Sequence, residues 1–582
     1  MYRKNEKHKQ AGLFEDHNYF SKRKQKLLED SWALKFYKEV FCRIEEDLFK
    51  CLYTEDFGRP NVPVNILAGL DIIKELKGYT DEELLQKFHF DYQVMYSLGI
   101  RKFGSTELGI RTLYYFRKRV AEYFAETGIN LTDMLFNEFV SQYIDEYEID
   151  ASEQRMDSSM VKSNMKKLSR LQLCVLTLQK FLNSLSDTYL ERVPADIARL
   201  VTEEGVGTYM ENANGSNYDS KLIDIGTKIF ALLELFSADE DIVNIEEYKL
   251  LERLFNDQFK IMDDNDKDDD KFNKIELKTS AEISSSALQN PSDPEATYRK
   301  KNGESYQGYK VNVSETHKDE NSVNILTEAN VYPNNKSDKE ILEEEASELR
   351  DRTGVGDLNL DGGYEGKDTE SKLKGKGIDL HYSGIKGRKS DKRKKISEHF
   401  TVSENRVVSC KNGEEPISSK RNEKGRYTIY KFSKNSCRRC PYRDSCPVEE
   451  QKKSNRLLIY ERTLEILRRE KEIDRVKQKR APIESVFFVL KHRYRMKDIP
   501  IRGLYKMNYY VKLKAIAFNF ARIMRYLDRK LIIDKKKLNK LAKSSIFKNI
   551  SKYLNYLKIL TLKNIKNLIL SKNSPKFRFY PI

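Results

Sequence analysis

The stretch Val-Gly-Asp-Leu-Asn-Leu-Asp-Gly-Gly-Tyr at residues 355–364 decides the fold that the sequence predicts. Its first six residues predict a strand that ends directly at Asp361. The two glycines that follow permit a sharp turn, which another backbone or a phosphate group can approach closely. An ordinary Asp-Gly turn has the same local pattern. The stretch therefore predicts a carboxylate at the carboxyl end of a strand.

The residues before this stretch indicate the kind of sheet to which the strand belongs. Residues 309–313 alternate polar and apolar side chains, and residues 324–331 form a second strand-like run. Ser337 and Glu340 have the spacing of a capping box, which predicts the start of a helix. The order strand, strand, helix, strand indicates a mixed α/β domain.

A second carboxylate, Asp157, lies between Met156 and Ser158 in a weakly strand-like stretch. Its local context is equally that of a polar residue at a strand edge or in a turn. Asp157 is therefore a candidate metal ligand only in combination with Asp361 and a third carboxylate farther along the chain.

The third carboxylate, Glu484, belongs to a segment with clear helical signals. Pro482 suits the first position of a helix. Apolar residues then recur at helical spacing and predict the buried face: Ile483, Val486, Phe487 and Leu490. Arg480, just ahead of the helix, and Lys491, two turns along it, lie on the same side as Glu484. Such a helix edge can hold a metal ion and DNA strands, although an exposed Glu–Lys face of an amphipathic helix has the same pattern.

Composition points to a polyanionic partner. The 582 residues include 106 Lys and Arg against 90 Asp and Glu, which gives a net charge of +16 and a pI near 9.1. This balance favours nucleic acid or an anionic surface as partner, although a general lysine bias would also make every surface basic. The amino terminus lacks the apolar core of a signal peptide, and no apolar run approaches the length of a membrane span. We therefore expect a cytoplasmic protein.

The seven cysteines favour a metal site over disulfides. Their number is odd, and four of them lie close in sequence: Cys410, Cys437, Cys440 and Cys446. Four thiolates suit tetrahedral Zn²⁺, which would stabilise a segment with little core of its own. Reduced cysteines without metal are the alternative.

The chain divides into segments of different composition, and a helical segment near the amino terminus is the first DNA-binding candidate. Its last helix carries Arg117, Lys118 and Arg119, which suit DNA binding, although a helical bundle with a solvated basic face fits too. The acidic run at 263–270 is typical of a solvated linker or insertion.

The composition predicts a division of the chain into segments. They are 1–58, basic and helical; 59–145, helical and DNA-binding; 146–165 with 291–380, the α/β core; 166–290, a helical and acidic insertion; 381–455, a turn-rich cysteine insertion; 456–530, core helices with Glu484; 531–582, a basic helical tail.

Several motifs together resemble one family. They are Gly58-Arg59-Pro60, Phe116-Arg117-Lys118-Arg119, Met156-Asp157-Ser158-Ser159-Met160-Val161, Asp293-Pro294-Glu295-Ala296-Thr297-Tyr298, Gly308-Tyr309-Lys310, Asp361-Gly362-Gly363-Tyr364, the cysteine module and Arg502-Gly503-Leu504. With them the chain resembles a DDE transposase of bacterial insertion sequences. The resemblance implies an RNase H-like catalytic domain, its mixed sheet split by insertions, in which Asp157, Asp361 and Glu484 bind metal. It also implies a Tyr-Arg-Glu-Lys signature, and here Lys477 stands where the tyrosine is expected.

The resemblance further implies a mechanism and partners. Two Mg²⁺ (or Mn²⁺) ions would assist cleavage at the ends of the element, and the freed 3′-hydroxyl would attack target DNA. The expected partner is double-stranded DNA, bound by a homo-oligomer on paired ends, without membrane. Arg480, Lys491 and the basic helix at 117–119 are the expected DNA contacts. Two alternatives remain: a catalytically silent DNA-binding protein derived from a transposase, and a metal-dependent nuclease without strand transfer.

Overall fold

The structure is a computed structural model that describes residues 1–542 except 11–14, 56, 212, 214, 216, 262–274, 302, 385–390 and 404–405. It contains two compact units, Met1–Phe520 and Ala521–Ile582. Among the described residues, no helix has the length and apolar character needed to cross a bilayer. The acidic run at 263–270 and the part of the basic tail from residue 543 onward lie outside the described residues.

The amino-terminal region is helical, as predicted. Thr80 caps one helix by a capping box with Glu83, and Leu84 and Phe88 form its buried face. The basic residues at 117–119 lie on a helix that buries Leu113, Phe116 and Val120. The helices are α1 (Lys22–Glu29), α2 (Trp32–Glu39), α3 (Val64–Lys77), α4 (Asp81–Phe90), α5 (Tyr92–Ser97), α6 (Ile110–Thr127) and α7 (Leu131–Glu146).

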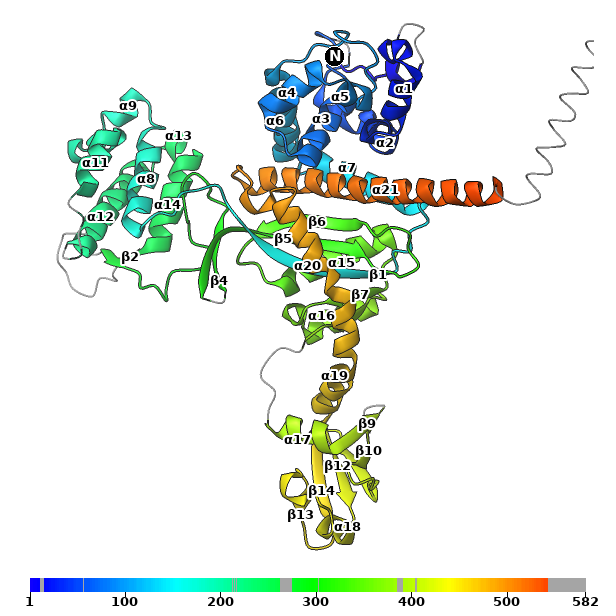
Figure 1. The fold of residues 1–582 in the computed structure, drawn as a ribbon. Helices are drawn as coiled ribbons and strands as arrows, with labels where there is room; N and C mark the ends of the chain where they lie inside the picture. The colour runs from blue at the N-terminus through cyan, green and yellow to red at the C-terminus, as the bar shows by residue number, and fades with distance from the viewer. Residues whose placement is uncertain are drawn as a thin grey trace, which may run out of the picture. The chain divides into compact units, whose positions relative to one another are not determined.

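A six-stranded mixed sheet forms the centre of the first unit (Figure 1). Its strands are β1 (Glu153–Lys162), β4 (Thr297–Lys301), β5 (Glu304–Thr316), β6 (Leu326–Pro333), β7 (Asp357–Leu360) and β8 (Asp379–Tyr382). The order is β4-β5-β1-β7-β8, and β6 also pairs with β5. Strand β5 is antiparallel to β1, β4 and β6, whereas β1, β7 and β8 run parallel to one another. The predicted strand, strand, helix, strand order is thus β5, β6, α15 (Asp338–Thr353), β7.

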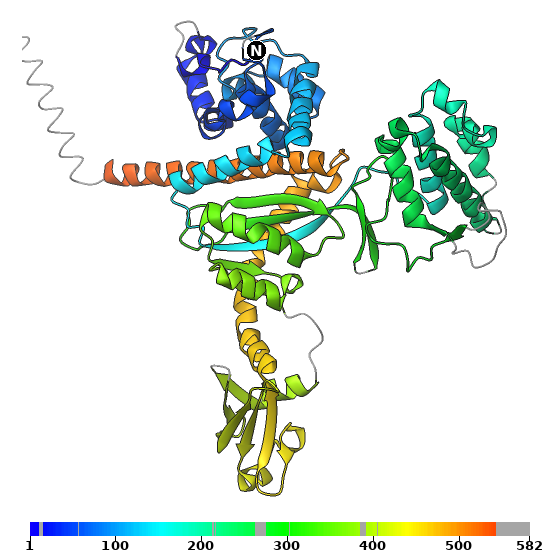
Figure 2. The same ribbon diagram turned by 180° about the vertical axis from the view of Figure 1, so that it is seen from behind.

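Helices lie on both faces of this sheet (Figures 1 and 2). On one face, α15 begins with the predicted Ser337–Glu340 capping box. Its apolar side chains pack with Met156 and with residues of α16 (Lys367–Gly375), β7 and β8 in one buried cluster. On the other face lie the end of α19 (Glu461–Arg480) and α20 (Pro482–His492). In α20 the predicted buried face is confirmed: Ile483, Val486, Phe487 and Leu490 are buried. Arg480, predicted just ahead of that helix, is the last residue of α19.

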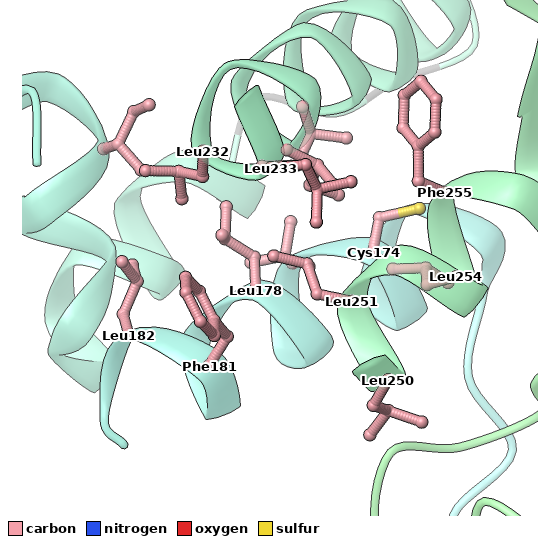
Figure 3. Packing of buried hydrophobic residues seen from close by; sticks show 14 of the residues in the cluster. Cys174, Leu178, Phe181, Leu182, Leu232, Leu233, Leu250, Leu251, Leu254 and Phe255 are labelled. Carbon is pink, nitrogen blue, oxygen red and sulfur yellow. The ribbon is translucent and has the colours of Figure 1, made fainter. Parts of the chain in front are cut away.

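The segment between β1 and β4 is mostly helical, and its apolar side chains form a core of their own (Figure 3). Leu178 and Phe181 pack there with Leu232, Leu251 and Leu254. The elements are α8 (Arg170–Leu182), α9 (Asp187–Leu190), α10 (Ala195–Ala198), α11 (Glu203–Glu211), α12 (Tyr218–Phe236), α13 (Glu240–Val243), α14 (Glu246–Gln258), β2 (Phe259–Ile261) and β3 (Ile275–Leu277).

The cysteine segment contains more regular structure than the turn-rich prediction allowed. A four-stranded sheet has the order β11-β12-β14-β13, and β9 pairs with β10 as a hairpin. Strand β14 pairs with β12, so the sheet extends past the predicted boundary at 455. The elements are α17 (Asp391–His399), β9 (Phe400–Ser403), β10 (Arg406–Cys410), β11 (Ser418–Asn422), β12 (Tyr427–Phe432), α18 (Lys434–Arg438), β13 (Glu449–Glu450) and β14 (Asn455–Tyr460).

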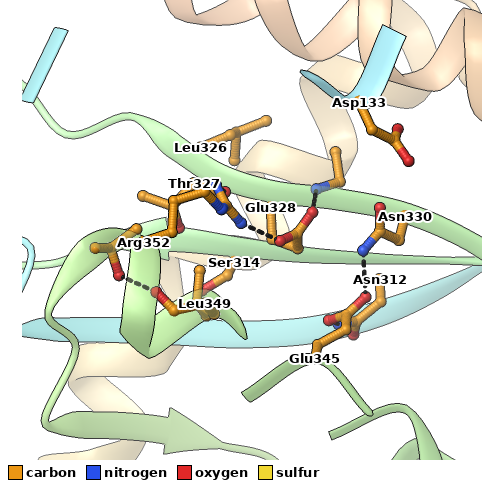
Figure 4. A network of polar contacts seen from close by, with 12 residues as sticks. Asp133, Asn312, Ser314, Leu326, Thr327, Glu328, Asn330, Glu345, Leu349 and Arg352 are labelled. Carbon is orange, nitrogen blue, oxygen red and sulfur yellow. Dashed lines mark hydrogen bonds and ion pairs between the residues drawn. The ribbon is translucent and has the colours of Figure 1, made fainter. Parts of the chain in front are cut away.

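A buried network of hydrogen bonds and ion pairs connects the sheet to neighbouring helices (Figure 4). Glu328 of β6 accepts hydrogen bonds from Arg352 of α15 and from Lys512 of α21 (Leu504–Ala542), the latter at 2.9 Å. Lys512 also lies 3.5 Å from Asp133 of α7. Nearby, the Glu345 carboxylate of α15 accepts hydrogen bonds from three side chains of β5 and β6: Asn312, Asn330 and Tyr332. The Glu328 charge is paired with Arg352 and Lys512, and the Glu345 carboxyl group is hydrogen-bonded, so the network can be held in the interior.

Candidate functional site

Asp157 lies in the middle of β1, on the side of the sheet where α19 ends. Its Oδ1 accepts a hydrogen bond of 2.8 Å from the Ser158 amide, and its Oδ2 accepts one of 2.6 Å from Arg480. The side chain is 17% exposed. Burial raises the pKa of Asp157 to about 6; the negative charges of Asp361 and Asp338 add to this rise, whereas Arg480 and the Ser158 amide oppose it. Asp157 is thus a half-buried carboxylate with other carboxylates nearby.

Asp361 follows β7 directly, as the sequence predicted. Strands β1 and β7 are parallel, with Arg155 opposite Asn359. Asp157 and Asp361 each come two residues later, so this register brings the two carboxylates to neighbouring positions. The effect of the Asp361 charge on Asp157 agrees with this placement.

Glu484 lies in the first turn of α20 and reaches the site through Arg480. The Arg480 guanidinium donates one hydrogen bond to Asp157 and another, of 3.2 Å, to Glu484 Oε1. The Glu484 side chain is 70% exposed. The structure thus brings all three predicted carboxylates into one region, with the Arg480 guanidinium between Asp157 and Glu484.

The end of α19 is anchored along β1. Alternate residues of a strand face the same side, so Glu153, Arg155 and Asp157 share one face of the sheet. Glu153 is paired with Lys479, and Arg155 donates a hydrogen bond of 3.0 Å to the Lys479 carbonyl oxygen. Arg155 is itself held by the buried Glu315 at 2.6 Å. These contacts, together with the Arg480–Asp157 pair, fix the junction that presents Glu484.

Asp338 is a fourth carboxylate of the site, and sequence reasoning missed it. It is the first residue of α15, and its Oδ1 accepts hydrogen bonds from the Ser158 hydroxyl (2.7 Å) and Lys310 (2.9 Å). Burial alone would raise the pKa of Asp338, but Ser158 and Lys310 hold it below its usual value. In the sequence, an aspartate after a helix cap reads as an acid that stabilises the helix amino terminus, so its context gave no signal of a site.

The expected basic contacts differ in their surroundings. Lys491 is half-buried; burial lowers its pKa, Lys497 and Lys301 lower it further, and the charge of Asp157 opposes them. The charge of Asp157 therefore reaches the Lys491 ammonium group.

On α6, Arg117 is unlike its two neighbours. Its guanidinium is paired with Asp71 and Asp81 and is 13% exposed, whereas Lys118 and Arg119 are exposed. The arginine that sequence reasoning placed among the DNA contacts thus has its charge inside the protein. Lys118 and Arg119 remain the candidates on this helix.

Three motifs that carried the resemblance meet near the start of α21. The Asp293 carboxylate accepts hydrogen bonds from the Tyr309 hydroxyl (2.5 Å) and the Gly503 amide (3.1 Å). Glu295 accepts a hydrogen bond of 2.7 Å from the Leu504 amide at the first turn of α21. These residues connect the sheet to α21 and so serve the architecture around the site.

The donor atoms suit a hard cation, because carboxylate oxygens are the ligands that Mg²⁺ prefers. The half-buried Asp157 and Asp338 and the exposed Asp361 concentrate negative charge in one region. Within the described ranges, however, no three histidine, cysteine, aspartate or glutamate side chains already lie close enough to hold a metal ion. Arg480 accounts for this at Glu484, since its guanidinium binds that carboxylate and Asp157 at once.

The described residues therefore define a mixed α/β protein with a cluster of carboxylates beside the parallel strands β1 and β7. Residues 409–524 match a family model described as the transposase DDE domain. The matched segment contains the four clustered cysteines and Glu484; Asp157 and Asp361 precede it. Over these residues the match confirms the resemblance to the DDE transposases of insertion sequences, and it supports a transposase-like role in general. No curated protein and no solved structure matches the chain.

Proposed function

We propose that this chain is a DNA transposase that cleaves DNA at the ends of an insertion sequence and joins the freed 3′-hydroxyl to target DNA. The observation that carries the proposal is the convergence of three carboxylates from distant parts of the sequence. Asp157 and Asp361 follow matching positions of two parallel strands, and Glu484 shares the Arg480 guanidinium with Asp157. The match to the transposase DDE domain supports the same conclusion.

We assign the sheet to the RNase H-like class. Three antiparallel strands, β6, β5 and β1, are followed by the parallel strands β7 and β8, and α15 connects β6 to β7. In chain order these five strands are β1, β5, β6, β7 and β8, so the first and fourth lie side by side, and β4 is an additional strand beside β5. Residues at their matching positions are therefore neighbours, which supports a common role for Asp157 and Asp361.

Asp157, Asp361 and Glu484 are the residues that would hold the divalent metal. A bound Mg²⁺ or Mn²⁺ supplies Lewis-acid activation of the attacking hydroxyl and charge stabilisation on the leaving oxygen. Arg480 holds Asp157 and Glu484 together, and a metal bound to these carboxylates would compete with its hydrogen bonds to them. Arg480 then has donors free for a phosphate oxygen of the DNA.

The cations around the site would position the DNA. Lys491, within the electrostatic reach of Asp157, is suited to a phosphate next to the bond that is cleaved. Lys118 and Arg119 on the exposed side of α6 are suited to phosphates farther from the chemistry. The net charge of +16 favours DNA association at low salt.

The test is a cleavage and joining assay with the purified chain and duplexes that carry the inverted repeats flanking its reading frame. Asp157→Asn, Asp361→Asn and Glu484→Gln should each abolish Mg²⁺-dependent cleavage and leave duplex binding intact. Asp368→Asn is the matched control, because this exposed acid of α16 lies outside the cluster. Full cleavage by any of the three variants would overturn the site.

The same assay separates the two alternatives. A wild-type chain that binds these duplexes but never cuts them would be a silent DNA-binding protein. Cleavage without any joined product would identify a nuclease that lacks strand transfer.

A further inference from the structure

A second site, independent of the carboxylates, lies in the cysteine segment. All four of its cysteines, Cys410, Cys437, Cys440 and Cys446, line one pocket, although Cys410 is 27 residues from the nearest of the others. None of them takes part in a disulfide. Three of them, Cys410, Cys437 and Cys446, pack against the buried apolar cluster of this segment. The pocket is thus rich in thiol groups and joins the edge of a small core.

The four cysteines come from two parts of this segment, the end of β10 and the stretch from α18 to the turn after it. Cys410 ends β10 in a tight turn, where its amide donates to the Glu414 carbonyl oxygen and its own carbonyl accepts from Gly413, both at 2.8 Å. Cys437 belongs to the short helix α18, and its carbonyl oxygen accepts a hydrogen bond of 3.4 Å from the Cys440 amide. A Cys-x-x-Cys pair on such a turn, opposite a cysteine on another turn, is typical of thiolate metal sites.

His399 provides a separate observation at the same pocket. It is the last residue of α17, its side chain contributes to the pocket lining, and it is only 5% exposed. In the described part of the chain, its Nδ1 has no hydrogen-bond partner. A buried ring nitrogen of this kind normally has a partner, so the pocket lacks a group that this nitrogen would contact.

We infer that the pocket binds one Zn²⁺ ion through the thiolates of Cys410, Cys437, Cys440 and Cys446, and that His399 Nδ1–H donates a hydrogen bond to one of the sulfur atoms. Each thiol loses its proton to solvent as its sulfur binds the ion, so no oxidant or reductant is needed. Thiolates are soft ligands that select zinc over the hard cations suited to the carboxylate site.

The ion would draw the sulfur atoms closer together than they are, since no three metal-binding side chains among the described residues already form a ligand set. Its role would be structural. The apolar cluster of this segment is small and includes residues of the β9–β10 hairpin, the four-stranded sheet and the start of α19. A metal cross-link between Cys410 and the other three cysteines would therefore hold the hairpin against the sheet. The exposed Arg438 and Arg439, which lie between two of the cysteines, would be fixed in place as well.

The experiment measures zinc in the full-length protein, purified under reducing conditions without added metal. We expect about one zinc per chain, and X-ray absorption at the zinc edge should show four sulfur neighbours at about 2.3 Å. Cys437→Ser and Cys440→Ser should lose the zinc. Cys51→Ser, which replaces an exposed cysteine outside the pocket, should keep it.

His399→Phe tests the role of the ring nitrogen. It should keep the four-sulfur site and weaken zinc affinity about 10-fold or more, as the loss of a hydrogen bond to a ligand does. A wild-type chain without zinc, one that holds iron in its place, or one with a disulfide between Cys437 and Cys440 would overturn the proposal. So would a site of three sulfurs and one nitrogen that disappears in His399→Phe. These readouts on the wild-type chain hold even where a cysteine variant fails to fold, and none of them depends on DNA cleavage.

Discussion

Replacing Arg117 should lower the stability of the protein, and any loss of DNA affinity should follow from that loss of stability. The Arg117 guanidinium donates hydrogen bonds of 3.0 and 3.2 Å to Asp71 from Nε, and of 3.0 and 2.8 Å to Asp81 from its two terminal nitrogens. Asp71 is only 1% exposed. Arg117→Met keeps the aliphatic stem but removes the charge, so Asp71 stays buried without its cation.

The size of the effect follows from these contacts. Loss of one partner from a buried ion pair costs about 3–5 kcal/mol. Two neighbours relieve part of it, because Tyr509 donates to Asp71 at 2.6 Å and Lys74 donates to Asp81 at 2.8 Å. We therefore expect a loss of about 3 kcal/mol, the lower end of that range. With a urea dependence of about 2–3 kcal/mol per molar, the midpoint should fall by roughly 1 M.

Lys118→Met and Arg119→Met are the matched controls on the same helix. Lys118 has an exposed ion pair with Glu122 at 3.3 Å, and Arg119 stacks on Tyr53 at 5.0 Å, so each change should cost about 1 kcal/mol or less. The assays are urea denaturation and fluorescence anisotropy with a labelled duplex at several salt concentrations. Each control should weaken DNA binding and reduce the salt slope by about 0.9 for a lost phosphate contact. If Arg117→Met unfolds at the wild-type urea concentration and its sole defect is in DNA binding, the reasoning is refuted.

Three further predictions concern the sheet and the site. Burial and the charge of Glu328 raise the pKa of Glu345 from 4.5 to about 8. Its contribution to the free energy of unfolding is therefore complete below pH 4.5 and is lost as pH rises through about 8. Glu345→Gln should make the free energy of unfolding, measured with urea, fall less over this pH range. Gly308→Ala should lower the thermal midpoint and cost about 2–3 kcal/mol, because φ is +147° and the added Cβ would lie 2.5 Å from the Val161 oxygen; an unchanged midpoint would contradict this. Lys491→Ala should weaken binding of duplex and lower the salt slope by about 0.9, with stability unchanged, whereas an unchanged slope would exclude a phosphate contact.

The parts of the fold that sequence predicts well are those whose local signals agree with their burial. α15 and α20 were predictable because a capping box opens the first, proline opens the second, and a 3.6-residue apolar period runs through both. In the cysteine segment, strand β11 gave no sequence signal because it buries little. β11 reads Ser-Ser-Lys-Arg-Asn and is largely exposed, so its sequence has no alternation that could mark a strand.

The sequence could indicate individual residues of the site, but it could not predict the contacts between them. Asp361 could be placed because β7 ends directly before it. The pairing of Arg480 with Asp157 joins residues 323 positions apart, and only the folded chain shows it. Likewise, Arg117 has the same sequence context as its basic neighbours, and its partner Asp71 lies on another helix. Contacts between distant segments depend on tertiary packing, which local patterns do not encode.

The central claim is that Asp157, Asp361 and Glu484 form one metal-dependent site, and a change of metal specificity tests it most directly. In Asp157→Cys and Asp361→Cys the ligand becomes a soft sulfur, which Mn²⁺ tolerates better than Mg²⁺. Both variants should lose cleavage of the element end with Mg²⁺ and recover at least about tenfold with Mn²⁺, while the Asp368→Cys control cuts equally well with either ion. Cleavage at the wild-type rate with Mg²⁺, or a folded variant whose loss Mn²⁺ does not relieve, would contradict the assignment.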